Sequence, residues 1–425
     1  MKGFNFEKNN RMKQYIPEQL TFDLYGHTLH HCQVISPDNQ WIVYDTRNED
    51  TAIGTTTRIE RVNVDTKEIQ VLYETKNANE YGPGVGAVTY SPTEEKVLFI
   101  HGIDNATADK PYEMARRTGV AIHTNIPNHP INMDARDVEF PYTKGALRGG
   151  THSHCWHPNS KLISFTYNDE VLAENHIPNE RAVGVMFPKQ VLVPNSEKDD
   201  QISGEMFSVI LTQLVEKAKA GSDEIEKAFD ECWLGDKRSL VFQGWVRDEN
   251  GNRKTEIFLA ELPNDLTLLD NVPLEGTKTQ YPGVPKGVII KRVSCTPKGV
   301  SSLRHWLRSS PDGDYVYFLM ENEENITNIY RINMSNSEIN QVTNHQTPIQ
   351  SPFNISPFGD QLIYFCNHQL ILFDINTSQS IPLIEKNDLL YGIPNFDKTG
   401  QQILFNQYVA DKTTSKFLQI FKIQL

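Results

Sequence analysis

The chain has 425 residues and a formal net charge of −13 at pH 7, because 54 acidic side chains outnumber 41 basic ones. Binding to nucleic acid needs concentrated lysine and arginine, and no long basic cluster occurs, so we expect no nucleic-acid partner. No run of 18 apolar residues occurs either, so we expect no membrane span.

The N-terminus and the cysteines indicate a compartment. The first residues, MKGFNFEKNNRMKQYIPEQL, lack the apolar core of a signal peptide, which predicts an unexported, cytoplasmic protein. Five cysteines without short repeated spacing favour reduced thiols over a disulfide framework. We expect Cys32 and Cys155 to pack as small side chains in inner strands.

A hairpin pattern recurs along the chain. Each copy is an apolar stretch, a turn of Pro, Asp, Asn and Gly, and a second stretch of β-branched and aromatic residues, which is typical of two antiparallel strands. Six copies occur, at residues 30–47, 87–102, 152–169, 305–322, 351–367 and 393–409. Several continue into a third strand, and such a repeat predicts the blades of a β-propeller.

The irregular middle of the chain predicts a seventh blade. Residues 239–262 have the pattern of two strands, and we place the first strand of that blade around 181–193. Between them, Ser222 or Asp223 can cap a helix. Five apolar residues follow at helical spacing: Ile225, Ala228, Phe229, Cys232 and Trp233. We therefore predict a small helical insertion at about 203–233.

The two ends of the chain predict how the ring closes. Gln19-Leu20-Thr21 precedes the first repeat much as residues 341–343 precede another, so the N-terminus should supply the outer strand of the last blade. The predicted fold is all-β, a seven-bladed β-propeller with a small helical insertion, as one domain over residues 1–425. The segment at about 104–144 is too long for an ordinary connection, which predicts a lid or a solvated surface loop.

Three histidines occupy one register of the repeats. His31, His152 and His305 each stand five residues before the first member of the turn dipeptide. Residues two apart on a strand share a face, so Gln33 and His154 join them. In equivalent blades these side chains would meet at the axis and bind a divalent transition metal. The alternatives are a metal-free catalytic or substrate-binding role and structural hydrogen bonding.

Arginines accompany these histidines. Arg148 and Arg304 lead into two of the histidine-bearing strands, and Arg308 follows further along. A planar guanidinium binds a carboxylate bidentately, which predicts an anionic substrate. Salt bridges between blades are the alternative, favoured for Arg308. Tyr391, at the corresponding register of the last repeat, would add a hydroxyl to the axis or fill space there.

Long motifs also carry a family resemblance. The chain resembles an uncharacterised bacterial family of TolB-like β-propeller proteins, in order and over nearly its whole length. The motifs are LRGGTHSHCWHPNSKLISFTYND (147–169), RIERVNV (58–64), VLFIHG (97–102), GSDEIEKAF (221–229) and RHW (304–306). This resemblance implies the fold and leaves the activity open.

More distantly, the chain is similar to the oligogalacturonate lyases. These are cytoplasmic seven-bladed propellers whose axial site uses histidines and a glutamine to hold a divalent metal, commonly manganese, with an arginine nearby. Gln33 and the four histidines of the shared register match that pattern, with Gln350 as a second candidate amide. The spacing of the histidines differs, which leaves substrate and reaction open.

The resemblance implies an enzyme that cleaves a small anionic saccharide, such as an oligouronide, by metal-assisted β-elimination. Arg148 and Arg304, helped by Arg308, would bind the carboxylate, His31 or an arginine would remove the adjacent proton, and Tyr391 or water would protonate the leaving oxygen. Hydrolysis, epimerisation or isomerisation of a sugar acid would use the same groups. The alternative is a non-catalytic propeller that serves as a protein-interaction scaffold or ligand-binding protein.

Overall fold

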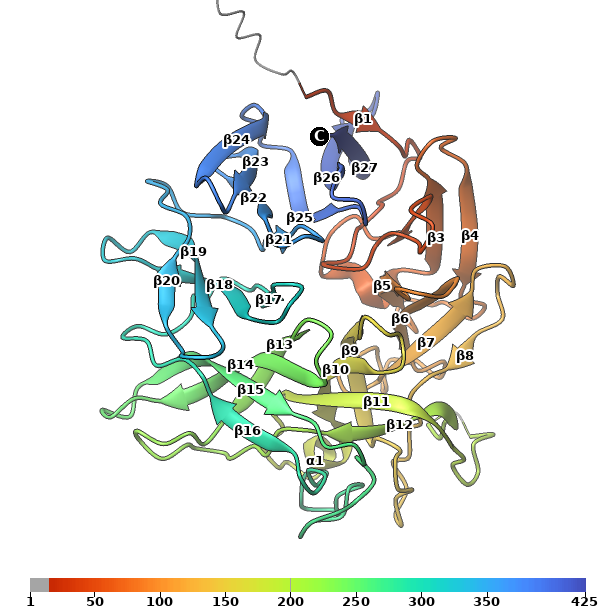
Figure 1. Ribbon diagram of the computed structural model, residues 1–425. Coiled ribbons are helices and arrows are strands. Elements are labelled where there is room, and N and C mark those ends of the chain that lie inside the picture. The colour runs from red at the N-terminus through yellow and green to blue at the C-terminus, as the bar shows by residue number, and fades with distance from the viewer. Residues whose placement is uncertain (1–14, 199) are drawn as a thin grey trace, which may run out of the picture.

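The computed structural model describes residues 15–198 and 200–425. Over that range the strands form seven antiparallel sheets arranged in a ring (Figure 1). One strand of each sheet stands nearest the central axis, and the chain passes from sheet to sheet in order. The predicted seven-bladed β-propeller is confirmed.

The blades are numbered here along the chain. The first contains β2 (Trp41–Asp45), β3 (Arg58–Asn63) and β4 (Ile69–Glu74), and the second β5 (Val85–Tyr90), β6 (Lys96–Gly102), β7 (Arg117–His123) and β8 (Ile131–Asn132). The third contains β9 (Gly149–Trp156), β10 (Ile163–Asp169), β11 (Ala182–Val191) and β12 (Gly204–Ile210), and the fourth β13 (Lys227–Trp233), β14 (Ser239–Arg247), β15 (Arg253–Glu261) and β16 (Ile289–Arg292).

The last three blades complete the ring. The fifth contains β17 (Arg308–Ser309), β18 (Tyr315–Glu321), β19 (Thr327–Asn333) and β20 (Ile339–Gln341), and the sixth β21 (Asn354–Ile355), β22 (Gln361–Cys366), β23 (Gln369–Asp374) and β24 (Gln379–Ile384). The seventh contains β25 (Leu390–Phe396), β26 (Gln402–Ala410), β27 (Lys416–Gln424) and β1 (Glu18–Gln19).

The repeated Ser-Pro turns have a structural role. In the first blade the Ser36 hydroxyl donates to the Asp38 carboxylate at 2.5 Å and accepts from the Trp41 amide at 2.9 Å. In the fifth blade the Ser310 hydroxyl accepts from the Tyr315 amide at 3.0 Å. A side-chain oxygen that binds backbone amides a few residues later holds a chain reversal. These serine side chains therefore stabilise the turns of the hairpins, which is a structural role.

The N-terminal segment closes the ring. In β1, Gln19 pairs with Phe421 of β27, and the Leu20 amide continues the pairing by donating to the Ile420 carbonyl at 2.8 Å. Leu20 is buried in a cluster that includes Ile42 of the first blade and Leu404 of the seventh. The prediction that the N-terminus supplies the outer strand of the last blade is confirmed.

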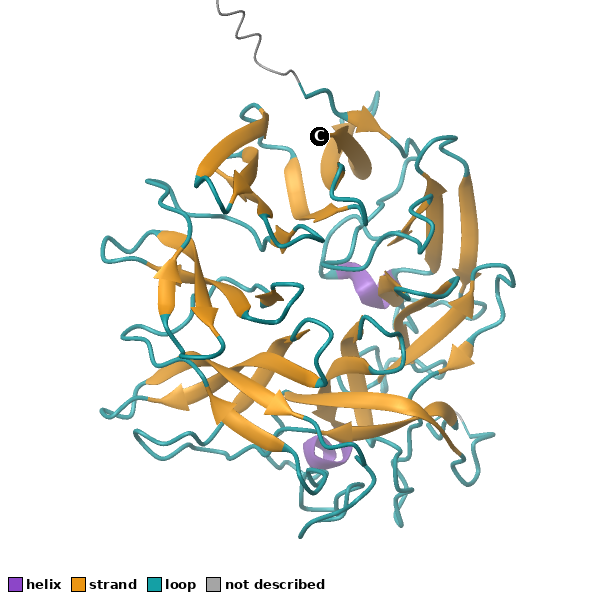
Figure 2. Cartoon of the chain, in the orientation of Figure 1, coloured by secondary structure: helices purple, strands orange, loops and turns teal. Residues whose placement is uncertain are grey.

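The predicted helical insertion at 203–233 is wrong. That segment holds β12, a loop and β13, and the only helices among the described residues are the 3-10 turn η1 (Ala52–Thr55) and α1 (Glu170–Glu174), both drawn in Figure 2. The apolar residues suggested a helix because β13 has a register shift between Phe229 and Cys232. The shift breaks the two-residue alternation by which a strand is predicted. The first strand of the fourth blade is thus β13, whereas 181–193 contains β11 of the third.

The predicted lid at 104–144 is also wrong as a single loop. Its middle forms β7 and β8 of the second blade, and Asp134 and Arg136 are buried.

In the part of the chain that the structure describes, no helix is long and apolar enough to cross a membrane. Residues 1–14, on which most of the signal-peptide prediction rests, lie outside the described range.

Ring closure predicts the effect of a single truncation. Leu20→Ala should lower the free energy of unfolding by roughly 2–5 kcal/mol, because it leaves a cavity at the junction of two blades. Leu24→Ala is the matched control, since Leu24 is 66% exposed and Leu20 0%. Urea unfolding monitored by fluorescence measures both. Equal midpoints for the two variants would show that the closing strand does not stabilise the ring.

Candidate functional site

Residues 28–35 take the innermost place of the first blade without forming a regular strand. Side-chain amides from the sixth and seventh blades hold the carbonyls at its start. The donors are Asn406 to His27 (2.7 Å), Asn395 to His30 (3.1 Å) and Asn354 to His31 (3.0 Å). Because these bonds replace a strand ladder, the alternation of strand side chains does not apply here. Consecutive side chains can therefore gather on one side.

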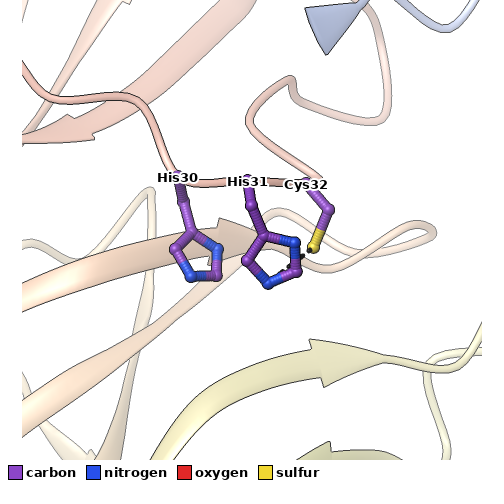
Figure 3. A group of neighbouring side chains, drawn as sticks. All are labelled: His30, His31 and Cys32. Carbon is purple, nitrogen blue, oxygen red and sulfur yellow. Dashed lines mark hydrogen bonds between the residues drawn. The ribbon is translucent and has the colours of Figure 1, made fainter. Parts of the chain in front are cut away.

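Two histidines and a thiol come together in this segment (Figure 3). The candidate ligand atoms of His30, His31 and Cys32 all lie within 4.8 Å of one another. The ring centroids of His30 and His31 are 4.2 Å apart, and His31 stacks on Trp306 with centroids 3.9 Å apart and planes 8° from parallel. Sequence reasoning missed His30, although the His-His dipeptide was the available signal.

Both imidazoles are held in the neutral form. Burial lowers the pKa of His30 well below its ordinary value, and the positive charges of Arg47 and Arg304 lower it further. Burial, His30 and Arg308 lower the pKa of His31 in the same way. The Nδ1 atom of His30 is buried and has no hydrogen-bond partner among the described residues. A neutral imidazole with a free nitrogen can accept a proton or bind a metal.

A pocket of about 500 Å³ opens beside these histidines, between the first, fifth, sixth and seventh blades. Its polar lining includes His30, His31, Asp50, Arg304, Asp388 and Tyr391. The guanidinium of Arg304 lies over the Trp306 ring at 4.5 Å, its nearest carboxylate oxygen is on Asp50 at 3.4 Å, and its side chain is 52% exposed. The Tyr391 hydroxyl accepts from the Asp50 amide at 3.1 Å. The structure thus places two of the predicted residues, Arg304 and Tyr391, at one pocket.

Four arginines concentrate positive charge near this pocket. Burial lowers the pKa of Arg117, and the charges of Arg47 and Arg304 lower it further. Burial also lowers the pKa of Arg181; Arg304 and Arg117 add to this effect, and Asp230 opposes it. The charge of Arg47 is balanced by a bidentate pair with Asp45 at 2.6 and 2.9 Å. Arg304 therefore has the most accessible charge for a ligand. A cluster of positive charge attracts anions even in a protein whose net charge is −13.

Two predicted metal ligands are committed to the fold. The Nδ1 atom of His305 binds the Leu303 carbonyl at 2.7 Å, and its Nε2 atom accepts from the Leu319 amide at 3.1 Å. The Gln33 amide donates to the Trp156 carbonyl at 2.7 Å and accepts from the Trp156 amide at 2.9 Å. Both nitrogens of His305 and both ends of Gln33 are thus occupied. Their prediction as metal ligands is wrong because backbone groups use the same atoms.

A repeated bulge changes the direction of the inner side chains. Ala87, Ser153 and Asp230 have positive φ values of 55°, 56° and 52°, each at a register shift in the innermost strand of its blade. A bulge places two residues opposite one and re-aims the side chains around it. His152 and His154 flank Ser153, so they do not share a face as a regular strand would require.

The structure does not bring His152 and His154 to His31. The Nε2 atom of His152 contacts Asn168 Oδ1 at 3.1 Å, and that of His154 contacts Thr151 Oγ1 at 2.9 Å. Each keeps a buried Nδ1 atom without a partner among the described residues. Burial lowers the pKa of His154 to about 3. The predicted cluster of His31, His152, His154 and His305 is therefore wrong, and the group of potential ligands found among the described residues is His30, His31 and Cys32.

Arg148 and Arg308 do not face the pocket. Arg148 is fully buried; it pairs with Asp169 at 2.9 Å and donates to the carbonyls of Thr277 and Gln280. Arg308 donates to Asn354 at 2.5 Å and to the His31 carbonyl at 2.9 Å. The predicted substrate-binding role is wrong for both, because their donors hold neighbouring elements together. Arg148 does form a salt bridge, but with Asp169 of its own blade, so the predicted salt bridge between blades is not the one observed.

A second, smaller pocket lies at the other end of the innermost strands, next to their turns. It measures about 240 Å³, and its lining includes Cys32, Gln33, Cys155, Glu231 and Cys232. Neither Glu231 oxygen has a hydrogen bond of good geometry among the described residues, although the Ser164 hydroxyl is near. Burial, reinforced by Asp230, raises the pKa of Glu231 to about 8. This carboxyl is therefore largely protonated at neutral pH.

The chain is similar in sequence to proteins of unknown function. The model of a family of proteins of unknown function, DUF3748, matches residues 84–201. The uncharacterized protein YidR of Escherichia coli (strain K12) is 35% identical over 362 residues, which are 83% of this chain and 85% of that protein. The chain therefore belongs to the family of YidR, and the predicted resemblance to an uncharacterised family is confirmed.

Solved structures share the fold. An oligogalacturonate lyase in complex with manganese is similar over 97% of this chain and 98% of that chain, with 10% identity and a TM-score of 0.55. A putative TolB from Agrobacterium tumefaciens is similar over 87% of this chain and 98% of that chain, with 13% identity and a TM-score of 0.43. At 10% identity the likeness to the lyase shows the propeller fold alone, and one fold supports many functions.

The buried carboxyl predicts a pH dependence of stability. The pKa of Glu231 rises from 4.5 to about 8 on folding, so the folded state holds an extra proton between those values and its stability falls as the pH rises. Glu231→Gln should remove this loss, and its advantage over the wild type should grow by roughly 1.4 kcal/mol per pH unit from pH 5 to 8.

Urea unfolding at pH 5.5, 6.5 and 7.5 measures this difference. Glu323→Gln is the control, because Glu323 is exposed and should keep the pH dependence of the wild type. A constant offset between the Glu231→Gln variant and the wild type at all three pH values would contradict the assignment.

Proposed function

We propose that the protein is a cytoplasmic enzyme that cleaves a small anionic saccharide, such as an oligouronide, by β-elimination. The observation that carries this proposal is the pocket that is lined by both the accessible guanidinium of Arg304 and the neutral imidazole of His30, whose Nδ1 atom has no hydrogen-bond partner among the described residues. The fold shared with an oligogalacturonate lyase supports it. A pocket of about 500 Å³ is of ordinary size for a small ligand.

The lining residues have the chemistry that elimination requires. Arg304 would bind the carboxylate of a uronate and stabilise the negative charge that develops when the adjacent C–H bond breaks. The His30 imidazole, which lines the pocket and is neutral, would accept that proton. The electron pair forms the C=C bond as the C–O bond to the leaving sugar breaks. The Tyr391 hydroxyl, or a water, would protonate the departing oxygen.

A divalent metal fits the same site. His30, His31 and Cys32 offer two neutral imidazoles and one thiol, a donor set that suits Zn²⁺ or Fe²⁺ better than the manganese of the lyase. A bound ion would supply Lewis-acid stabilisation of the substrate carboxylate. A bound ion would use the nitrogen lone pair of His30, so His30 would act as the base only in the metal-free site. In both cases the sugar acid would be bound through Arg304.

A second candidate function is supported by a separate surface. Ile16, Phe22 and Leu24 are exposed and lie close in sequence to the closing strand β1, and apolar side chains that gather on a surface favour a protein partner. A propeller that presents such a patch would act as an interaction scaffold. Binding of a protein there would leave the pocket of His30 and Arg304 free.

The substrate prediction is tested with a panel of oligouronides and other acidic sugars. The wild type should generate unsaturated products, seen as a rise in ultraviolet absorbance and by mass spectrometry. Arg304→Gln should lower kcat/KM by about a hundredfold or more, because the carboxylate loses its charged partner. Arg331→Gln, on β19 beside Tyr315, is the matched control. Failure of the wild type to bind or convert any acidic sugar would overturn the proposal in favour of the scaffold.

The metal prediction has its own measurement. Protein purified without a histidine tag should hold about one equivalent of a divalent transition ion by elemental analysis. His30→Ala and Cys32→Ser should each lose most of it, whereas His129→Ala should not, because His129 is exposed on the outer part of the second blade. Full retention by both site variants would show that these residues are not the ligands.

A further inference from the structure

Two cysteines from non-adjacent blades are in contact at the smaller pocket. The sulfur of Cys32, from the first blade, lies 3.4 Å from the sulfur of Cys155, on β9 of the third blade, 123 residues away in sequence. The distance is a contact between two free thiols and not a bond. Joining them would link the first blade to the third.

The surroundings hold this pair in place and leave it accessible. Gln33 binds both backbone groups of Trp156, so the residues that follow one cysteine fix the strand of the other. Both thiols are half-buried and line the smaller pocket of about 240 Å³ together with Cys232. The hydrogen bond with Cys32 and burial raise the pKa of the Cys155 thiol. Cys32 is therefore the thiol placed to attack a small reagent in this pocket, and Cys155, whose sulfur touches it, is placed to close the bond.

We propose that Cys32 and Cys155 form a reversible disulfide by exchange with a small-molecule disulfide of the glutathione type. The thiolate of one cysteine attacks a sulfur of the reagent, which forms a mixed disulfide and releases one thiolate. The thiol of the other cysteine loses its proton and attacks the protein-bound sulfur, which releases the second small thiolate. Two electrons pass from the cysteine pair to the reagent, whose S–S bond is replaced by the one in the protein.

This exchange would control the site above it. Cys32 follows His31, and its Sγ atom lies 3.8 Å from His31 Nε2. Oxidation would take the sulfur away from the group of possible metal ligands and hold the backbone of His31 to the third blade. This consequence rests on the proposed function, whereas formation of the disulfide does not.

The test uses the full-length protein, with and without prior removal of metal by a chelator. After incubation with oxidised glutathione, thiol counting in denaturant should show the loss of two of the five free thiols, and non-reducing peptide mapping should join the peptides of Cys32 and Cys155. A thiol reductant should restore both. The oxidised protein should melt at a higher temperature, because the cross-link restricts the unfolded chain.

Matched variants make the result specific. Cys32→Ser and Cys155→Ser should each abolish the linked peptide, and Cys295→Ser, which alters an exposed cysteine elsewhere, should leave it intact. The proposal is overturned by persistence of all five thiols, by a stable glutathione adduct without a cross-link, or by a linkage to Cys232. Loss of metal or of activity on oxidation is scored separately, so an inactive protein that still forms the cross-link counts against the proposed function alone.

Discussion

The pairing of β1 with β27 is the contact on which the rest of the molecule depends. It fixes the first blade beside the seventh, although the two are separated by nearly the whole chain. The larger pocket lies at this junction, since His30 comes from the first blade and Tyr391 from the seventh. Closure of a ring from its two ends therefore does more than protect a sheet edge. It assembles residues that no local segment contains.

Buried polar groups give this junction its chemical character. Asn354, Asn395 and Asn406 bind backbone carbonyls of the segment that carries His30 and His31, so the segment is held without a strand ladder. Burial then keeps the two imidazoles neutral. Neutral bases beside an accessible guanidinium form a site that can bind an anion and accept a proton from it. The same positive charge would oppose a nearby cation, so a metal would need strong donors.

The fold was predictable because its signals are local. Turn residues such as Ser36 and Ser310 act within five residues of themselves, and strand periodicity needs only a short window. The failed helix shows the limit, because the bulge at Asp230 gives a strand the spacing of a helical stripe. Arg304, which precedes β17, and Tyr391, on the inner strand β25, line one pocket because the inner strands converge. The metal cluster was not predictable, since amide contacts from distant blades and the bulge at Ser153 decide which histidines meet.

The pocket between the first and seventh blades is proposed to bind the carboxylate of an acidic sugar. A crystal structure of the protein soaked with a short oligouronide tests it most directly. We expect a uronate carboxylate within hydrogen-bonding distance of Arg304, with the adjacent C–H bond facing the imidazole of His30. An oligouronide bound elsewhere on the ring, or an unaltered pocket at saturating ligand, would contradict it.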